Sequence, residues 1–182
     1  MKYIIASDIH GSAHWCRKLV ENFKREGADR LLLLGDLLYH GPRNPLPQEY
    51  DPMAVAAMLN EPELYSMGVR GNCDAEIDQV VLSFPMFCDY ALLAYGKRSI
   101  VLSHGHIFSP ESLPPMKKGD VFISGHIHVP VCYEKDGVLC LNPGSVSIPK
   151  EDSVNSYLSF EDGLFQWKDM EGNVYKEYRL ED

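Results

Sequence analysis

The sequence lacks long hydrophobic runs and is poor in positive charge. No stretch approaches the roughly 18–20 apolar residues that a membrane-spanning helix needs, and the apolar run at residues 1–6 is too brief for a signal peptide. Lys and Arg number 17 against 26 Asp and Glu, so the formal net charge is −9. An acidic protein lacks the broad basic surface that a nucleic-acid polymer requires. We therefore expect neither a membrane nor a nucleic-acid polymer as a partner.

Cysteine pairs, repeats and linkers are missing as well. The five cysteines are odd in number and scattered, and none forms a C-x-x-C pair. This usage favours a reduced compartment over a disulfide framework and predicts a cytoplasmic protein. No internal repeat, low-complexity tract or linker divides the chain, and 182 residues suit one ordinary domain. We expect a single domain over residues 1–182.

The first part of the chain predicts a βαβ unit. The apolar run at residues 2–6 predicts a buried strand, apolar residues at helical spacing over 12–26 predict a helix that Gly27 ends, and residues 30–34 predict a second strand. A strand, a helix and a strand in this order are typical of a parallel sheet. A proline-rich loop is predicted for 39–52, a helix for 53–59, a third strand for 65–69 and a helix for 75–82.

The second half of the chain consists of short apolar runs separated by turns. These runs predict strands at 87–94, 99–103, 121–124, 131–134, 138–141, 156–160, 164–169 and 173–180. A chain that begins as βαβ and continues mainly as strands suits two layers of sheet. The expected fold class is α/β, with two mixed β-sheets packed face to face as a sandwich flanked by helices.

Polar motifs follow five of the predicted strands. They are Asp8-Ile9-His10-Gly11, Gly35-Asp36, Gly71-Asn72-Cys73-Asp74, Ser103-His104-Gly105-His106 and Gly125-His126-Ile127-His128. Because the carboxyl ends of parallel strands share one edge of a sheet, these side chains should converge, and the glycines let the backbone turn sharply there. Carboxylates held together away from water need a cation, and mixed oxygen and nitrogen donors suit a divalent metal of intermediate hardness. The number of donors is sufficient for two ions.

Each motif taken alone has an ordinary alternative. D-x-H is commonly a surface turn, Asp36 could cap a helix, and G-N-C-D is a turn-forming sequence. His104 and His106 could be interior histidines with satisfied hydrogen bonds. The ordered set of five motifs favours the metal site over these separate explanations.

The set of motifs resembles the calcineurin-like metallophosphoesterases, in the order of that family and over residues 1–149. Residues 39–45, 71–74 and 142–145 resemble more specifically its small bacterial YfcE-type phosphodiesterases. The resemblance implies the αββα metallophosphoesterase fold and two divalent metal ions, with manganese the expected metal. It assigns one metal to Asp8, His10 and His128, the second to Asn72, His104 and His126, and Asp36 to both.

The resemblance also implies a mechanism. A hydroxide that bridges the two metals would attack a small phosphodiester, with Asp36 and Asn72 counted among the catalytic residues. Many relatives carry a histidine, regarded as the general acid, where this chain has Cys73. A thiol is a weak donor, so we expect diesters with acidic leaving groups to be preferred and phosphomonoesters to be weak substrates. Cys73 could instead simply pack as a small apolar residue.

Three further residues are candidates for the site. His106 is the next candidate acid, although a structural role would also explain it, and Asp74 could be only a helix N-cap. His40 and Arg43 lie on the proline-rich loop after Asp36, where they could bind substrate, since a guanidinium grips phosphate well. A solvated arginine on a loop is the alternative.

Two questions remain open at this level. A non-catalytic scaffold of the same fold that binds partner proteins, as the small retromer subunit does, is the alternative function; the complete ligand set favours an enzyme. The aromatic residues of the C-terminal segment could be core or an exposed patch for self-association, and the family likeness suggests a homo-oligomer, a dimer or tetramer. They are Tyr157, Phe160, Phe165, Trp167, Tyr175 and Tyr178.

Overall fold

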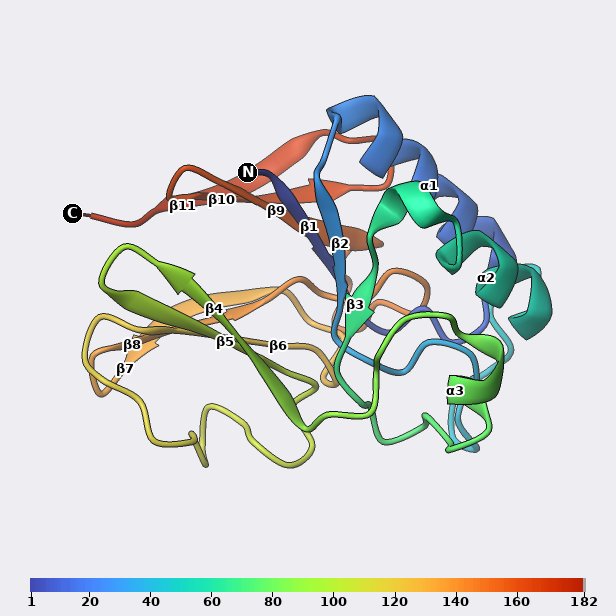
Figure 1. The fold of residues 1–182 in the computed structure, drawn as a ribbon, viewed down its shortest axis with the longest axis horizontal. Coiled ribbons are helices and arrows are strands. Elements are labelled where there is room, and N and C mark those ends of the chain that lie inside the picture. Colours follow the sequence, from blue (N-terminus) through green and yellow to red (C-terminus); the bar gives the residue numbers. More distant parts are fainter. Residues whose placement is uncertain (182) are drawn as a thin grey trace.

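Two β-sheets packed face to face form the centre of the molecule in the computed structural model, which describes residues 1–181 (Figure 1). The six-stranded sheet has the order β11-β10-β9-β1-β2-β3. Its strands are β1 (Tyr3–Ala6), β2 (Arg30–Leu33), β3 (Met67–Gly68), β9 (Ser156–Glu161), β10 (Leu164–Asp169) and β11 (Val174–Arg179). The five-stranded sheet has the order β4-β5-β6-β8-β7. Its strands are β4 (Tyr90–Tyr95), β5 (Arg98–Ser103), β6 (Val121–Ser124), β7 (Val131–Lys135) and β8 (Val138–Asn142).

Both sheets combine parallel and antiparallel pairs, which confirms the predicted sandwich of two mixed sheets. In the first, β1, β2 and β3 are parallel while β9, β10 and β11 are antiparallel neighbours. In the second, β5, β6 and β8 are parallel and the edge strands β4 and β7 are antiparallel. Each sheet therefore contributes three parallel strands whose carboxyl ends can carry polar loops.

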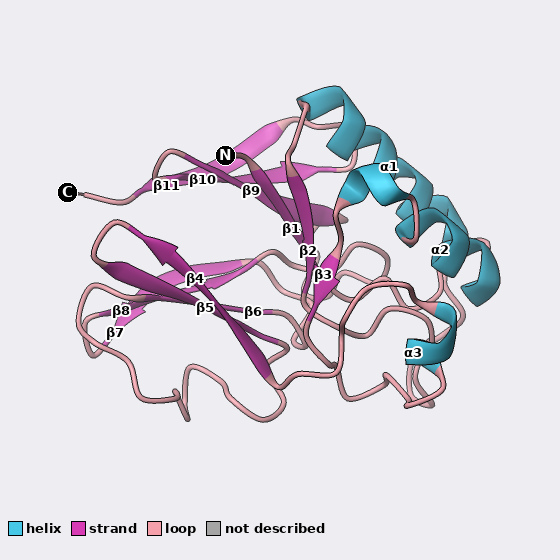
Figure 2. Ribbon diagram, viewed as in Figure 1, coloured by secondary structure: helices cyan, strands magenta, loops and turns pink. Residues whose placement is uncertain are grey.

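The helices are α1 (Ala13–Glu26), α2 (Pro52–Leu59) and α3 (Asp78–Val81), with a 3-10 turn at Pro62–Leu64 (Figure 2). The Ser12 side chain accepts a hydrogen bond from the backbone of Trp15 and caps α1, and Gly27 ends the helix with φ 59°. Apolar residues of α1 and α2 pack on the outer face of the six-stranded sheet. The outer face of the other sheet is covered by the segment 105–119. Within residues 1–181, no helix has the length and apolar character needed to cross a membrane.

The period-2 alternation of strand side chains divides the core into layers. Ile5, Leu32 and Leu158 face the interior of the sandwich together with Phe165 and Trp167. Their neighbours along the strands, such as Ile4 and Leu31, face the helices instead. All of these side chains are almost fully buried, and each buried large apolar side chain contributes about 1.5–3 kcal/mol. The two buried layers hold both sheets rigidly beneath the loops at their carboxyl ends.

Two predicted elements are shorter than expected. The strand predicted for 65–69 pairs only at Met67 and Gly68, because Tyr65 has φ 43° and leaves the extended conformation. The helix predicted for 75–82 is α3, four residues long, whose preceding turn is closed by the Asp78 carboxylate accepting from the backbone of Ala75. The shortening gives the segment after β3 an irregular course toward the site.

Candidate metal centre and active site

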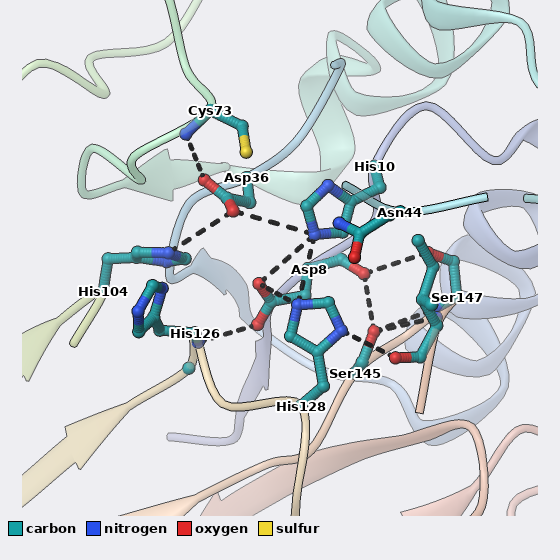
Figure 3. A network of polar contacts seen from close by, with 12 residues as sticks. Asp8, His10, Asp36, Asn44, Cys73, His104, His126, His128, Ser145 and Ser147 are labelled. Atoms are coloured by element: carbon teal, nitrogen blue, oxygen red, sulfur yellow. Dashed lines mark hydrogen bonds and ion pairs between the residues drawn. The ribbon is translucent and has the colours of Figure 1, made fainter. Parts of the chain in front are cut away.

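Loops at the carboxyl ends of both sheets bring five of the seven predicted ligands into one buried cluster (Figure 3). The cluster members are Asp8 and His10 after β1, Asp36 after β2, His104 after β5 and His128 after β6, each at most 3% exposed. Nε2 of His10 lies 3.5 Å from Asp8 Oδ1 and 3.7 Å from Asp36 Oδ2. Nε2 of His128 lies 3.2 Å from Asp8 Oδ1, and Nε2 of His104 lies 3.5 Å from Asp36 Oδ2.

The backbone at these positions is held in an unusual conformation. Left-handed φ angles of 50–70° occur at five predicted ligands: Asp8, His10, Asp36, His126 and His128. This conformation costs an L-residue of order 1–2 kcal/mol, and such strain concentrates at functional sites. The surrounding backbone compensates, because Asp8 N donates to Gly35 O and His10 N donates to Asp36 O. The strain turns the side chains of consecutive loop residues toward a common centre.

The three buried histidines have defined tautomers. Nδ1 of His10 lies 2.9 Å from Tyr39 O, Nδ1 of His104 lies 2.7 Å from Leu34 O, and Nδ1 of His128 lies 2.6 Å from a backbone carbonyl. A carbonyl oxygen only accepts, so each Nδ1 carries a proton, and the Nε2 atom of each ring faces the cluster, where it can bind a metal ion in place of a proton. This arrangement of ring nitrogen and backbone carbonyl is the usual support of a metal-ligating histidine.

A cation fits between these groups. Nε2 of His10 and Nε2 of His128 are 3.3 Å apart, so two lone pairs face each other unless a positive charge lies between them. Asp8 Oδ1 is buried beside both nitrogens and has no hydrogen-bond partner. A buried carboxylate oxygen without a partner is costly, and a divalent cation would satisfy it. The donor set of one carboxylate and two imidazoles therefore suits a metal ion.

The electrostatics of the cluster favour positive charge at the same place. Burial raises the pKa of Asp8, but the neighbouring imidazoles of His10 and His128 outweigh it and hold the pKa well below its usual range. Burial lowers the pKa of His104, but Asp36 and Asp8 raise it to about 9. The carboxylates thus stabilise a positive charge at the imidazole nitrogens. A bound divalent ion would supply this charge in place of protons.

A second group of donors adjoins the first. Asn72 Oδ1 lies 3.1 Å from Nε2 of His104, which in turn faces Asp36. The ring of His126 is 5.1 Å from that of His104, centroid to centroid, and its backbone N–H donates to Asp8 Oδ2. Asn72 is exposed and His126 half-buried, so these two donors lie on the open side of the cluster. His106 lies near both, with ring centroids 5.3 Å from His104 and 6.3 Å from His126.

Asp74 has a different role from the helix N-cap that its sequence position suggested. Its buried carboxylate accepts hydrogen bonds from the backbone N–H groups of Asp36 (2.8 Å), Leu37 (2.9 Å) and Gly71 (2.7 Å). Asp74 therefore ties the loop after β2 to the loop after β3, and it holds Asp36 in its left-handed conformation. Gly71 is the sequence signal that these two loops approach closely. Only glycine fits there, because a Cβ would lie 2.1 Å from Asp36 Oδ1.

The segment after β8 supports Asp8 from the other side. Ser145 and Ser147 both donate their hydroxyl groups to Asp8 O, at 2.9 and 3.1 Å (Figure 3). Asn142 Nδ2 donates to Gly125 O, next to the His126–His128 loop. The Asn-Pro-Gly-Ser sequence at 142–145 thus positions a ligand without touching the centre itself, and sequence reasoning missed the part played by Ser147.

A cavity of about 1200 Å³ opens above the cluster. Arg43 lines it together with four of the predicted ligands, Asp36, Asn72, His126 and His128. His40 is not among the lining residues: its ring packs edge-on against Tyr39 and Tyr50, so the structure gives no support for its binding to substrate. The lining also includes residues to which sequence reasoning gave no role of their own, among them Tyr39, Arg70, Ile127 and Lys150.

Comparison with known proteins agrees with this site. A family model described as the calcineurin-like phosphoesterase superfamily domain matches residues 1–162. The chain belongs to this superfamily. As a member it is a hydrolase that acts on phosphoric ester bonds, and the family implies divalent metal ions for the cluster described above. The predicted resemblance is therefore confirmed.

Individual relatives support the same assignment. The chain is 46% identical over 157 residues to phosphodiesterase YfcE of Escherichia coli K12, covering 86% of this chain and 85% of that protein. The solved structure of this E. coli phosphoesterase superimposes with a TM-score of 0.95 over 100% of both chains, at 39% identity. A Bacillus subtilis protein described as a probable metallophosphoesterase, YsnB, is 28% identical over 168 residues, 86% of this chain and 82% of its own.

Some solved structures resemble this chain in fold alone. Vps29 of Entamoeba histolytica, solved in complex with Zn²⁺, superimposes with a TM-score of 0.63 over 100% of both chains at 18% identity. A likeness at this identity reports the arrangement of the sheets and not the function. The superfamily assignment and the relation to YfcE favour the enzyme.

Proposed function

We propose that this protein is a metal-dependent phosphodiesterase that hydrolyses small phosphodiesters. The observation that carries the proposal is the buried cluster in which Asp8 Oδ1 has no partner and two imidazole nitrogens face each other at 3.3 Å. A divalent cation at the floor of the cavity would satisfy the carboxylate oxygen and both imidazole nitrogens at once. The relation to a named phosphodiesterase at 46% identity supports a diester as the substrate.

Two divalent metals, with manganese the expected ion, are the proposed cofactors. One would be held by Asp8, His10 and His128, and the other by Asn72, His104 and His126, with Asp36 shared between them. When bound, two such cations neutralise the phosphate oxygens and supply a bridging hydroxide as the nucleophile. The residues of the chain supply the geometry, since the backbone carbonyls behind His10, His104 and His128 orient their rings toward the centre.

Cys73 supports the preference for diesters. Its backbone N–H donates to Asp36 Oδ1 at 2.8 Å, and its side chain lines the cavity. Burial, followed by the charge of Asp36, raises the pKa of this thiol to about 12, so the group is neutral and a poor proton donor at neutral pH. The leaving oxygen then receives little help, which favours acidic leaving groups and predicts weak phosphomonoesterase activity.

His106 is the next candidate proton donor, and we propose that it is a weak one. Its exposed ring lies beside His104 and His126, but it does not line the cavity. Burial and the charge of His104 lower its pKa, so most of it would be neutral near pH 7. His106 therefore contributes little acid, in keeping with a substrate that needs none.

The remaining expectations concern the whole protein. A single domain over residues 1–182 is supported by the pairing of β1 with β9, which joins the N-terminal and C-terminal parts in one sheet. A cytoplasmic location is supported by the five cysteines, all of which are free. The net charge of −9 supports the expectation of no nucleic-acid polymer as substrate, and we keep the expectation of no membrane partner.

A homo-oligomer, a dimer or tetramer, remains part of the proposal, although of the six C-terminal aromatic residues only Tyr175, at 44% exposure, is well exposed. Tyr157, Phe160, Phe165 and Trp167 are buried in the core and cannot form an exposed patch. The edge strand β4 is the better candidate, because it contains no charged residue and exposes Tyr90 and Leu92. An uncharged, apolar edge strand is prone to pair with another chain.

The decisive experiment is reconstitution. Metal-stripped protein is loaded with manganese and assayed on bis(p-nitrophenyl) phosphate beside p-nitrophenyl phosphate. We expect hydrolysis of the diester, little hydrolysis of the monoester, and two metal ions per chain. Folded, metal-loaded protein that hydrolyses neither compound would refute the proposal in favour of the scaffold.

A further inference from the structure

Three cations surround the metal cluster at the wall of the cavity. They are Arg43, Arg70 and Lys150, and none of them is a predicted metal ligand. Positive charge is scarce in this chain, with 17 basic against 26 acidic residues. The gathering of three basic side chains around one opening therefore needs an explanation beyond the general composition.

Each cation is attached to a loop that positions a metal ligand. Arg43 follows Tyr39, whose carbonyl accepts from His10. Arg70 directly precedes the Gly71-Asn72 turn. The backbone N–H of Lys150 donates to His128 O at 3.1 Å. The backbone of each of these residues is thus anchored beside the centre, within reach of a side chain of this length.

Within residues 1–181, the charges of these side chains are not neutralised by ion pairs, although Arg70 Nε donates a hydrogen bond to the backbone carbonyl of Asp74 at 3.4 Å. In the part of the chain that the structure describes, the ion pairs join other residues, such as Lys24 with Glu61 and Lys168 with Glu26, and include none of the three cavity cations. The guanidinium of Arg70 is held over the ring of Phe87 at 4.8 Å. One acidic side chain outside the cluster and its support, that of Glu76, lines the same cavity and opposes them. Counted with Asp36 and Asp74, the lining carries as many acidic as basic residues, so the cavity becomes net positive when divalent ions occupy the cluster.

The cavity is larger than the reacting phosphate requires. Its volume of about 1200 Å³ exceeds the roughly 300–1000 Å³ of ordinary small-molecule sites. Tyr39 and Ile127 are 43% and 48% exposed and add an apolar wall on which an organic group can rest. The site can thus hold a scissile phosphate at the metals, an organic group on the wall, and a further anion on the cations.

We propose that Arg43, Arg70 and Lys150 form an anion subsite, and that the preferred substrate is a phosphodiester whose organic group carries a second phosphate or carboxylate. This inference rests on the proposed function and narrows it to a substrate class. Guanidinium groups bind such anions through paired hydrogen bonds, and Lys150 adds a point charge. The subsite selects by binding and takes no part in the bond-breaking step.

A matched pair of nucleotide esters tests the subsite. Thymidine 5′-(p-nitrophenyl phosphate) and its 3′-phosphorylated form share the same reaction: water adds to phosphorus, the bond to p-nitrophenolate breaks, and a 5′-phosphate remains. They differ only in the second anion. We expect kcat/KM to be about tenfold higher for the 3′-phosphorylated ester, mainly through KM, which is the size of one charge-assisted contact.

Variants identify the residues responsible. Arg70→Gln combined with Lys150→Gln should reduce the preference to less than about twofold, and Lys150→Gln alone, at an exposed position, should reduce it in part. Lys97→Gln, an exposed residue in the turn between β4 and β5, is the matched control and should retain the full preference. Hydrolysis of bis(p-nitrophenyl) phosphate by each variant reports folding and the integrity of the metal centre.

Three results would overturn the subsite. These are equal kcat/KM for both esters, a preference that survives in the double variant, and a loss in the double variant that is equal for all three substrates. The last would mean that the cations bind the scissile phosphate itself. If no diester is hydrolysed, the proposed function fails, and binding then tests the subsite by itself. Metal-loaded protein should bind thymidine 3′,5′-bisphosphate about tenfold tighter than thymidine 5′-monophosphate. Equal affinity for the two nucleotides would refute the subsite.

Discussion

Replacement of Asp74 by Asn tests how far the metal centre depends on a residue outside it. The carboxylate is 3% exposed and accepts three backbone hydrogen bonds, two at Oδ2 and one at Oδ1. An amide keeps only one acceptor oxygen. The less damaging orientation keeps the bonds from Asp36 and Gly71 and places the NH₂ group against the N–H of Leu37, so one bond is lost and two donors face each other.

The expected cost follows from this geometry. Loss of one hydrogen bond to a charged acceptor, together with a buried unsatisfied donor, lowers the free energy of unfolding by about 2–4 kcal/mol. The loop that holds Asp36 in its left-handed conformation also loosens. Loss of a residue that supports a metal ligand typically weakens metal binding by about 10- to 100-fold, and we expect Asp74→Asn to do so.

Asp120 provides a matched control in the same chain. It is 5% exposed, and its two oxygens accept from the backbone N–H groups of Ser99 and Lys117, away from the metal cluster. Asp120→Asn should therefore destabilise the protein similarly and leave metal affinity unchanged. Urea unfolding of the metal-free variants measures the first quantity and manganese titration the second. Equal metal affinity in the two variants would refute the assigned role of Asp74.

Three further predictions concern the shared ligand Asp36, the thiol of Cys73 and the ion pairs of Glu26. Asp36→Asn should reduce manganese binding from two ions per chain to at most one tight ion and lower diester hydrolysis by at least about 100-fold, measured by equilibrium dialysis and initial rates; near-normal rates would remove Asp36 from the shared position. Cys73→His should raise kcat/KM for alkyl phosphate esters by at least about tenfold and flatten the dependence on leaving-group pKa, and an unchanged slope would contradict the missing-acid explanation. Burial raises the pKa of Glu26, but its ion pairs with Lys168 and Lys2 lower it below the ordinary 4.5. The stability that Glu26 contributes is therefore present above about pH 4.5 and lost as pH falls through the lowered pKa, so Glu26→Gln should be less stable at pH 7 and show a shallower fall in urea midpoint below pH 5; parallel pH profiles would exclude this ion network.

Local sequence determined the elements and their order. The apolar runs predict most strands within a few residues, and Ser12 and Gly27 mark the ends of α1 as caps do in general. The exceptions are β3 and α3, which are shortened by local turns at Tyr65 and at residues 75–78. Their lengths depend on backbone conformations such as the positive φ of Tyr65, for which the sequence carries no clear signal.

The kinds of side chain in the centre were also determined by the sequence. Carboxylates, imidazoles and one amide after successive strands predict a cation site wherever those strands end together, because strand ends in a parallel sheet share one edge. The structure brings Asp8, His10, Asp36, His104 and His128 together in this way. His126, Asn72 and the binding role of Arg43 remain predictions that metal and substrate titrations can test.

Only the tertiary structure decided which residues support the centre and what surrounds it. Asp74 accepts a hydrogen bond from the loop after β2, and Ser145 and Ser147 donate to Asp8 O. These hydrogen bonds join segments up to 139 residues apart. Periodicity carries no information on such contacts, since each depends on the exact path of two loops. The same holds for Arg70 and Lys150, which are ordinary loop residues in the sequence and become neighbours of one cavity only when the two sheets pack face to face.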